Sequence, residues 1–124
     1  MTDNLTHVNE AGEVWMVDIS GKTAGPREAI ATGRVRCAPE TIALIQSQTA
    51  RKGDVLATIR LAGIQGAKRT PELVPLAHPI AIQAVRVDLE LTQDSIEITA
   101  AVKTNDATGI EMEALTAVSC AALT

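Results

Sequence analysis

Two neighbouring segments, residues 85–91 and 96–102, constrain the fold of this chain more than any other feature. Apolar side chains occupy every second position in both, and charged side chains lie between them in the first. Alternation with a period of two is typical of a strand that buries one face. Gln93–Ser95 separates the two segments and has the composition of a turn. The sequence therefore predicts an antiparallel hairpin whose apolar face must be covered by other elements.

A further half-buried strand is predicted over residues 29–37. Small apolar residues alternate there with Arg34 and Arg36, which places both arginines on the face opposite the core. Val14–Ile19 is predicted to be a short extended segment, and Gly25–Pro26 is predicted to lie in a loop before the strand.

Three helical segments are predicted between these strands. Pro39 suits the first turn of a helix over residues 39–46, and Asp54 is a good N-cap for a helix to about residue 67. Thr70–Glu72 resembles a cap and first turn, but Pro75–Pro79 limits it to a brief helix followed by a stiff loop. With a final helix, this order of elements favours an α+β fold with an antiparallel sheet.

The final helix is predicted to start with a capping box, in which Thr108 and Glu111 each satisfy a free amide of the first turn. Glu113 lies about 200° around the helix from Glu111, so the two carboxylates face different ways. The sequence reaches Thr124 without a Gly, Asn, Pro or basic last turn, which predicts a helix that is not completed there. An apolar stripe suited to close packing recurs at helical spacing at Met112, Leu115, Val118 or Ser119, and Ala122.

Composition predicts one globular domain over residues 1–124, with residues 1–12 as an N-terminal tail. Hydrophobic residues make up 46% of the chain, but Trp15 is the only aromatic one, so the core must be aliphatic and thin, which favours self-association. No apolar run approaches the roughly 20 residues of a membrane span, and the start does not resemble a signal peptide, so we expect a cytoplasmic protein. Cys37 and Cys120 lack CxxC spacing and are predicted to be small core residues.

Charge is distributed unevenly along the chain. The net charge is −4, yet residues 22–69 carry nine basic and three acidic residues, a balance of +6 that leaves −10 elsewhere. This distribution argues against a general nucleic-acid binder and suits a small polyanion such as a nucleoside triphosphate. Ordinary solvated faces of strands and helices explain the same counts at least as well.

Two residues stand out as candidates for chemistry. Lys52 precedes Gly53 and the expected helix start, where amide donors and a cation together can hold an oxyanion. A solvated loop lysine is the alternative. His78 is confined between Pro75 and Pro79, so it is either a fixed acid, base or hydrogen-bond donor, or a histidine bonded to a loop backbone.

A metal site is not expected from the sequence. The chain has two histidines and no HxxxH or CxxC grouping, which is too few ligands for zinc. A metal-dependent hydrolase that uses His78 with Glu111 or Glu113 is a lower-ranked alternative, and it would be distinguished by loss of activity in a chelator.

Seven short segments, in their order and spacing, closely resemble the MoaC family, the cyclic pyranopterin monophosphate synthases of molybdenum cofactor biosynthesis. They are Leu5–Val8, Met16–Ser20, Lys52–Val55, Ala62–Gln65, Ala67–Thr70, Pro75–Pro79 and Thr108–Thr116. The resemblance covers essentially the whole chain.

The resemblance implies a ferredoxin-like α+β subunit, assembled as a homohexamer (a trimer of dimers) with active sites at subunit interfaces. It implies conversion of 3′,8-cyclo-7,8-dihydro-GTP into cyclic pyranopterin monophosphate with release of pyrophosphate, and it implies no cofactor. Lys52, His78 and Glu111 match catalytic positions of the family. Substrate-binding positions are matched by Arg27, Leu76, Ala77, His78, Met112 and Glu113.

Three departures from the family pattern bear on activity. Ala77 stands where the family usually has cysteine, and Ala107 where it has lysine or a similar residue. The family helix also continues past the position of Thr124 into an Asp-x-x-Lys element, whose aspartate is the principal catalytic acid/base, and then into a segment with another lysine. We therefore expect the synthase reaction of the complete protein, and loss of most activity if residues 1–124 are the whole. The alternative is a catalytically impaired homologue that acts as an oligomerising or nucleotide-binding module.

Overall fold

The computed structural model describes residues 5–47 and 54–124. Three antiparallel strands form its sheet, in the spatial order β1 (Gly25–Arg36), β3 (Ser95–Asp106) and β2 (Ile82–Leu91). The central strand is thus the last of the three in the sequence, and both of its neighbours run against it. The predicted antiparallel sheet is confirmed.

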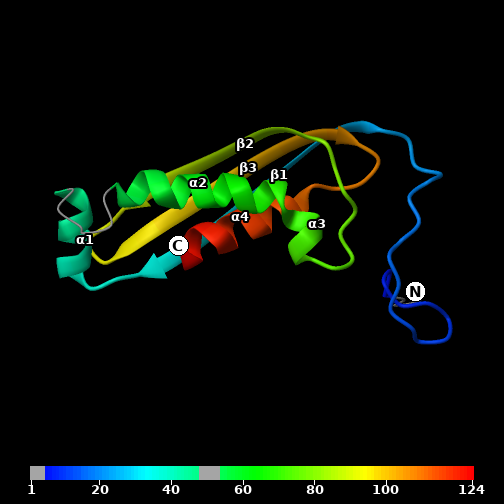
Figure 1. Ribbon diagram of the computed structural model, residues 1–124, viewed down its shortest axis with the longest axis horizontal. Coiled ribbons are helices and arrows are strands. Elements are labelled where there is room, and N and C mark those ends of the chain that lie inside the picture. The colour runs from blue at the N-terminus through cyan, green and yellow to red at the C-terminus, as the bar shows by residue number, and fades with distance from the viewer. Residues whose placement is uncertain (1–4, 48–53) are drawn as a thin grey trace.

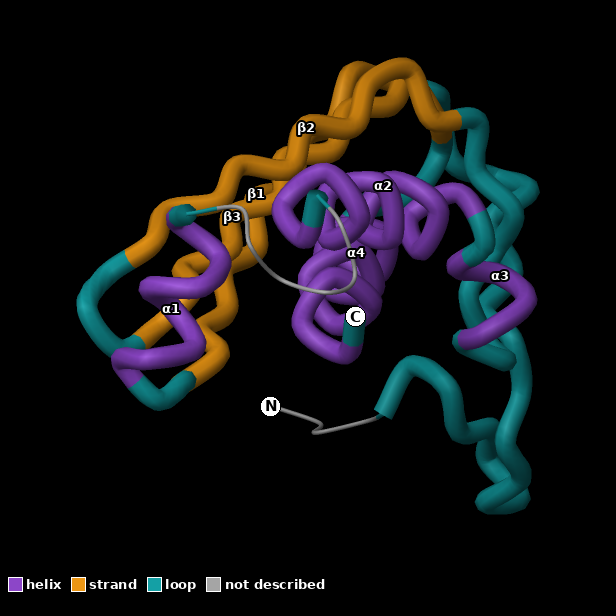
Figure 2. Tube along the Cα trace, turned by 60° about the vertical axis from the view of Figure 1, so that its left-hand side comes forward, coloured by secondary structure: helices purple, strands orange, loops and turns teal. Residues whose placement is uncertain are grey.

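Four helices accompany the sheet, α1 (Pro39–Gln46), α2 (Val55–Lys68), α3 (Thr70–Leu73) and α4 (Glu111–Leu123). Helices α2 and α4 pack against each other and cover one face of the sheet, while α1 and α3 lie near opposite ends of the molecule (Figures 1 and 2). The result is a two-layer α+β arrangement, as predicted, and it is consistent with a ferredoxin-like fold. No helix in residues 5–47 and 54–124 is long and apolar enough to cross a membrane.

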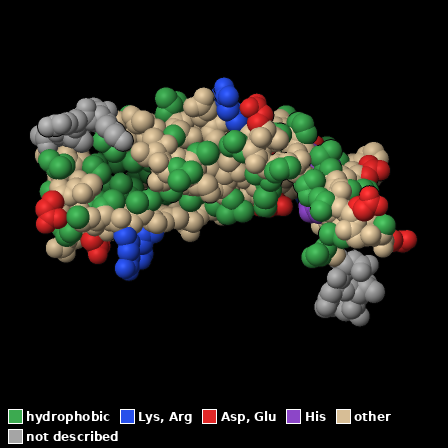
Figure 3. Space-filling model, turned by 60° about the horizontal axis from the view of Figure 1, so that its bottom comes forward, with side chains coloured by type: hydrophobic (Ala, Val, Ile, Leu, Met, Phe, Trp, Pro, Cys, Tyr) green, Lys and Arg blue, Asp and Glu red, His purple; other side chains and the backbone are tan. Residues whose placement is uncertain are grey.

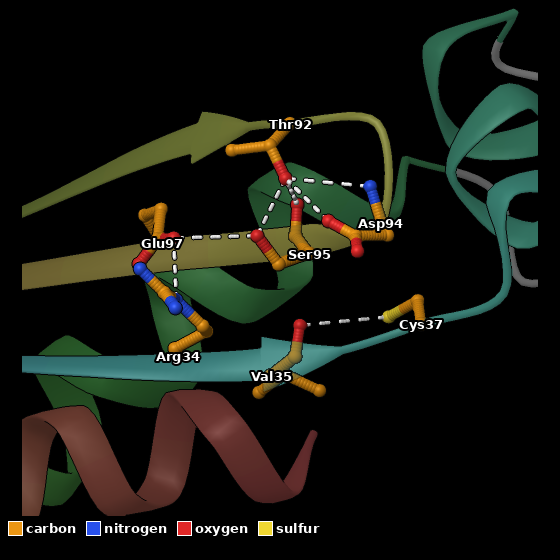
Figure 4. A network of polar contacts seen from close by, with 7 residues as sticks. All are labelled: Arg34, Val35, Cys37, Thr92, Asp94, Ser95 and Glu97. Atoms are coloured by element: carbon orange, nitrogen blue, oxygen red, sulfur yellow. Dashed lines mark hydrogen bonds and ion pairs between the residues drawn. The ribbon is translucent and has the colours of Figure 1, made fainter.

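The hairpin of β2 and β3 forms as the alternation predicts, with a shift in register after Ile82. Its turn is closed by Thr92, whose amide donates to the carbonyl of Ser95 at 2.9 Å and whose hydroxyl lies 2.5 Å from Ser95 Oγ (Figure 4). Ser95 is buried and already belongs to β3, so the turn is shorter than predicted.

Strand β1 begins earlier than predicted, because Gly25 and Pro26 pair with the end of β3 instead of lying in a loop. Ala29, Ala31 and Val35 pack in or against the core, and Arg34 and Arg36 are exposed, as predicted. Ile30, between Ala29 and Ala31 in the sequence, is also exposed. Arg34 Nε donates to Glu97 Oε1 on the neighbouring strand at 2.7 Å (Figure 4).

The N-terminal segment, residues 5–24, leaves the body as an arm (Figure 1). Val8 and Val14 form an isolated antiparallel bridge, and residues 15–19 take no part in the sheet. The predicted extended segment Val14–Ile19 is therefore not a strand of the fold, and Trp15 within it is 44% exposed.

Helix α2 starts as predicted, since Asp54 Oδ1 accepts a hydrogen bond from Ala57 N at 3.0 Å. The glycines that weaken it as an isolated helix serve its packing, because a Cβ on Gly66 would lie 2.7 Å from Cys120 Sγ. Thr70 does not cap α3 as predicted. It lies inside that helix, fully buried, and its hydroxyl donates back to the last carbonyls of α2 at Gly66 and Ala67.

The predicted capping box at the start of α4 is wrong. The helix begins at Glu111 with Ile110 as its N-cap, and no side chain caps it. Ile110 is 1% exposed, so burial of this side chain anchors the start of the helix. Thr108 consequently lies before the cap, and Glu111 is the first helical residue instead of the third.

The buried face of α4 differs in part from the predicted stripe, of which Val118 is buried. Met112 and Leu115 are 38% and 50% exposed, whereas Ala114, Ala117 and Ala121 are almost completely buried. Alanine is preferred on the buried face because α4 lies very close to its neighbours. Figure 3, which turns the lower side of Figure 1 forward, shows hydrophobic side chains exposed over much of the body.

The core is aliphatic, as the composition predicts. Its largest apolar members with almost no exposure are Ile42, Ile98, Ile110 and Val102. Cys37 is half-buried against this core, Cys120 is half-buried beside Gly66, and both thiols are free.

Candidate functional site

One end of the sheet brings together segments that are distant in the sequence. The start of β1 lies opposite the end of β3, with Gly25 paired to Asp106, and the start of β2 lies there too, with Ile82 paired to Thr104. From this end the chain continues into α4, and the loop that carries His78 leads into β2. Most of the predicted site residues therefore gather at one end of the molecule.

Glu113 is the most unusual side chain at this end. It lies in the first turn of α4 and is 2% exposed, and neither carboxylate oxygen has a hydrogen-bond partner in the described part of the chain. Burial raises the pKa of the Glu113 carboxyl, and the nearby charge of Glu111 raises it as well. A buried polar group of this kind is costly unless a partner satisfies it, so the position favours a ligand with donor groups.

Glu111 differs sharply from Glu113 in its surroundings. It is exposed, and its carboxylate folds back over Gly109, where an added Cβ would collide with it. The two carboxylates face different ways, as the sequence predicts. One is therefore open to solvent and the other is enclosed, which suits them to different roles.

Arg27 lies at the start of β1 and is held by backbone groups. Its Nε donates to the carbonyl of Asp106 at 3.1 Å and its Nη2 to that of Ala107 at 3.5 Å. The side chain is exposed and borders a hollow of about 360 Å³, which is lined by Pro26, Arg27, Glu28, Gln83, Lys103 and Thr104. Arg27 thus joins β1 to the segment that leads into α4.

His78 is half-buried in the loop between α3 and β2. Its Nε2 lies 2.5 Å from the carbonyl oxygen of Val17, and because a carbonyl can only accept, Nε2 is the donor. The backbone hydrogen bond that the sequence offers as one alternative is therefore present, and it also holds the imidazole in one orientation. Asp18, the neighbour of Val17, has its pKa lowered by hydrogen bonds from Ser20 and by His78.

The remaining predicted site residues do not all lie at this end of the molecule within the described part of the chain. Leu76 and Ala77 are half-buried beside His78, and Met112 is partly exposed on the outer side of α4. Lys52 lies outside the described residues. Asp54, the first described residue after it, starts α2 beside α1, at the opposite end of the molecule from α3 and the His78 loop (Figure 1).

Sequence reasoning missed Thr104 and Asp106. The Thr104 hydroxyl donates to the carbonyl of Ala81, and Asp106 Oδ2 accepts from Ala81 N at 3.4 Å. Thr104 is 2% exposed although it is polar, and a polar residue on the apolar side of a strand was the available signal. Among residues 5–47 and 54–124 there is no cluster of three or more His, Cys, Asp or Glu side chains that could hold a metal ion.

The fold defines an α+β protein in which the start of β1, the loop that carries His78 and the start of α4 lie at the same end of the sheet. The profile of the MoaC family matches residues 16–124, and the chain belongs to that family. It is 57% identical over 122 residues to a protein of Streptomyces coelicolor, an alignment that covers 98% of this chain and 72% of that protein. It is 56% identical over 124 residues to one of Dinoroseobacter shibae, covering 97% and 77%. Both relatives bear the name cyclic pyranopterin monophosphate synthase.

Proposed function

We propose that this chain carries the cyclic pyranopterin monophosphate synthase function of molybdenum cofactor biosynthesis. The reaction converts 3′,8-cyclo-7,8-dihydro-GTP into cyclic pyranopterin monophosphate and pyrophosphate. Membership of the family and the names of relatives with more than half of their aligned residues identical support this proposal.

The observation that carries the proposal is the buried carboxylate of Glu113, which has no partner among residues 5–47 and 54–124. The ring system of a guanine-derived substrate presents adjacent N–H donors, which are the groups that such a carboxylate lacks in the described chain. In this proposal Glu113 holds the ring, while the exposed Glu111 and the imidazole of His78 serve the proton transfers.

The triphosphate of the substrate requires cations. Arg27 is exposed at the same end of the sheet, and we assign it to the phosphates together with Lys52. Lys52 follows from the family resemblance alone. Leu76, Ala77 and Met112 complete the proposed binding surface beside His78 and Glu113.

We further propose that the protein is a homohexamer, a trimer of dimers with sites between subunits. The exposed apolar side chains of Met112 and Leu115 on α4, and the thin aliphatic core, support association. Native mass spectrometry would test this state, and a monomer at working concentration would contradict it.

The decisive experiment supplies 3′,8-cyclo-7,8-dihydro-GTP to the purified complete protein and, in parallel, to residues 1–124 alone. The expected products are cyclic pyranopterin monophosphate, identified by mass spectrometry, and one pyrophosphate per turnover. Turnover that survives EDTA would separate this function from a metal-dependent hydrolase. Binding of the substrate without product would refute catalysis by this chain and favour the nucleotide-binding module.

A further inference from the structure

Asp106 occupies the point where three segments of the candidate site meet. It is the last residue of β3, and each of its carboxylate oxygens serves a different segment. Oδ1 accepts from Ala107 N at 2.7 Å, at the start of the connection to α4. Oδ2 accepts from Ala81 N at 3.4 Å, at the end of the loop that carries His78. One side chain therefore bridges the two segments that hold the proposed acid/base groups.

Ala81 is held on its other side as well. Its carbonyl accepts from the hydroxyl of Thr104, which is 2% exposed. The first pair between β2 and β3 is Ile82 opposite Thr104, just before the register shift, so the side chains of Thr104 and Asp106 extend the attachment by one residue beyond the paired strands. Only two residues lie between His78 and Ala81, and the first of them is Pro79, whose ring makes this segment stiff. Fixing Ala81 therefore restricts the position of the imidazole.

The segment after β3 is fixed from the opposite direction. Arg27 on β1 donates to the carbonyls of Asp106 and Ala107, which immediately precede the loop to Glu111. The backbone carbonyl of Asp106 is thus bonded to Arg27 of β1. In its side chain, Oδ1 is bonded to Ala107 and Oδ2 to Ala81. Removal of this carboxylate breaks its bridge between the His78 loop and the start of α4 without touching either proposed acid/base group.

We infer that Asp106 is a positioning residue, which with Thr104 holds the His78 loop in register with the start of α4. The catalytic consequence of this inference rests on the proposed function, whereas the structural consequence does not. Asparagine at this position has a single acceptor oxygen and can keep one of the two attachments, whereas alanine keeps neither.

The test compares Asp106→Ala and Asp106→Asn with the matched controls Asp88→Ala and Asp88→Asn. Asp88 is an exposed carboxylate of β2 that pairs with Arg86 at 3.0 Å. Nuclear magnetic resonance would follow hydrogen exchange of the Ala81 amide and the ring signals of His78. In Asp106→Ala we expect exchange to be at least about fivefold faster, with shifted His78 signals, and in Asp106→Asn a smaller change of both. The controls should match the wild type.

A kinetic comparison adds a second readout. With the cyclic GTP intermediate as substrate, Asp106→Ala should lower kcat by about tenfold and change KM by about twofold or less, because the binding groups remain. In Asp106→Ala combined with Thr104→Val, the effects should not add, since both side chains hold the same residue.

Unchanged Ala81 exchange and His78 signals in Asp106→Ala would overturn the inference, as would equal changes in the Asp88 variants. Changed signals with wild-type kcat in a turning-over enzyme would also overturn it. If the wild-type chain shows no turnover, the proposed function fails, and the magnetic resonance result still decides the positioning role.

Discussion

The two ends of the sheet use their polar groups in opposite ways. At the turn between β2 and β3, Thr92 and Ser95 bond each other, and Glu97 accepts from both Ser95 and Arg34 (Figure 4). At the other end, Glu113 is buried with two unpartnered oxygens in the described part of the chain. The turn end satisfies its groups locally, whereas the site end leaves one carboxylate unsatisfied.

This difference separates what the fold needs from what a ligand needs. A buried carboxylate without donors costs free energy, and nothing in the packing of α4 requires one. Such a group persists where function requires it, so the unsatisfied end is the one to which we assign chemistry. The comparison predicts that changes at the site end alter activity more than stability, and that changes at the turn end do the reverse.

The largest effect is expected from Glu113→Gln. The amide keeps the size of the side chain but has a single acceptor oxygen, so it cannot pair with two donors of the ring, and the misplaced ring should lower kcat by about 10²-fold. Glu40→Gln is the matched control, because Glu40 is an exposed carboxylate in the first turn of α1. Steady-state kinetics on the cyclic GTP intermediate would measure both. If Glu113→Gln kept the kcat of the wild type, the assignment of chemistry to the site end and not to the turn end would be contradicted.

The same variant makes a second prediction, about stability against pH. Burial raises the pKa of the Glu113 carboxyl above its usual value of 4.5, so the folded protein holds this proton more tightly than the unfolded chain does. The contribution of this bound proton to the free energy of unfolding is fully present below pH 4.5, and it is lost as the pH rises through the raised pKa of Glu113.

Glu113→Gln cannot lose a proton, so its free energy of unfolding relative to the wild type should increase with pH. The gain at alkaline pH should be about 1 to 3 kcal/mol, measured by urea unfolding across the acidic to alkaline range. Glu40→Gln should show a nearly constant difference. If the difference in free energy of unfolding between Glu113→Gln and the wild type did not change with pH, the carboxyl of Glu113 in the wild type would not be enclosed.

The framework of the fold could be read from the sequence because it rests on local patterns. Alternation predicted all three strands of the sheet, and Asp54 predicted the start of α2, since one side chain and the following amides decide it. The start of α4 was predicted wrongly because burial of Ile110, a tertiary contact, outweighed the Thr108–Glu111 pattern.

The candidate site was only partly predictable for the same reason. Glu113 and His78 could be singled out by spacing, but the burial of Glu113 depends on which face α4 turns to the sheet. The predicted apolar stripe reported this face only at Val118. The attachment of Ala81 by Thr104 and Asp106 joins residues more than twenty positions apart. No local pattern reports such a contact.

A smaller effect is expected from Ser95→Ala at the turn end. The change removes the bonds of the hydroxyl to Thr92 and Glu97 and should lower the free energy of unfolding by about 0.5–1.5 kcal/mol, with kcat unchanged. Thr58→Ala, which removes an exposed hydroxyl bond to the carbonyl of Asp54, is the control and should stay within about 0.5 kcal/mol. Loss of kcat in Ser95→Ala would show that the two ends are not separable.

The smallest effect should come from Arg34→Ala, although its bond to Glu97 is short. The arginine side chain is 59% exposed and that of Glu97 is 30% exposed, so water screens the pair and the expected loss of stability is about 0–1 kcal/mol. Adding salt should reduce this loss further. Glu97 also keeps the hydroxyl of Ser95 as a donor, which limits the cost of removing the arginine. Urea unfolding at low and high salt would measure it, and a loss above about 2 kcal/mol would mean that this end depends on charge rather than on local hydrogen bonds.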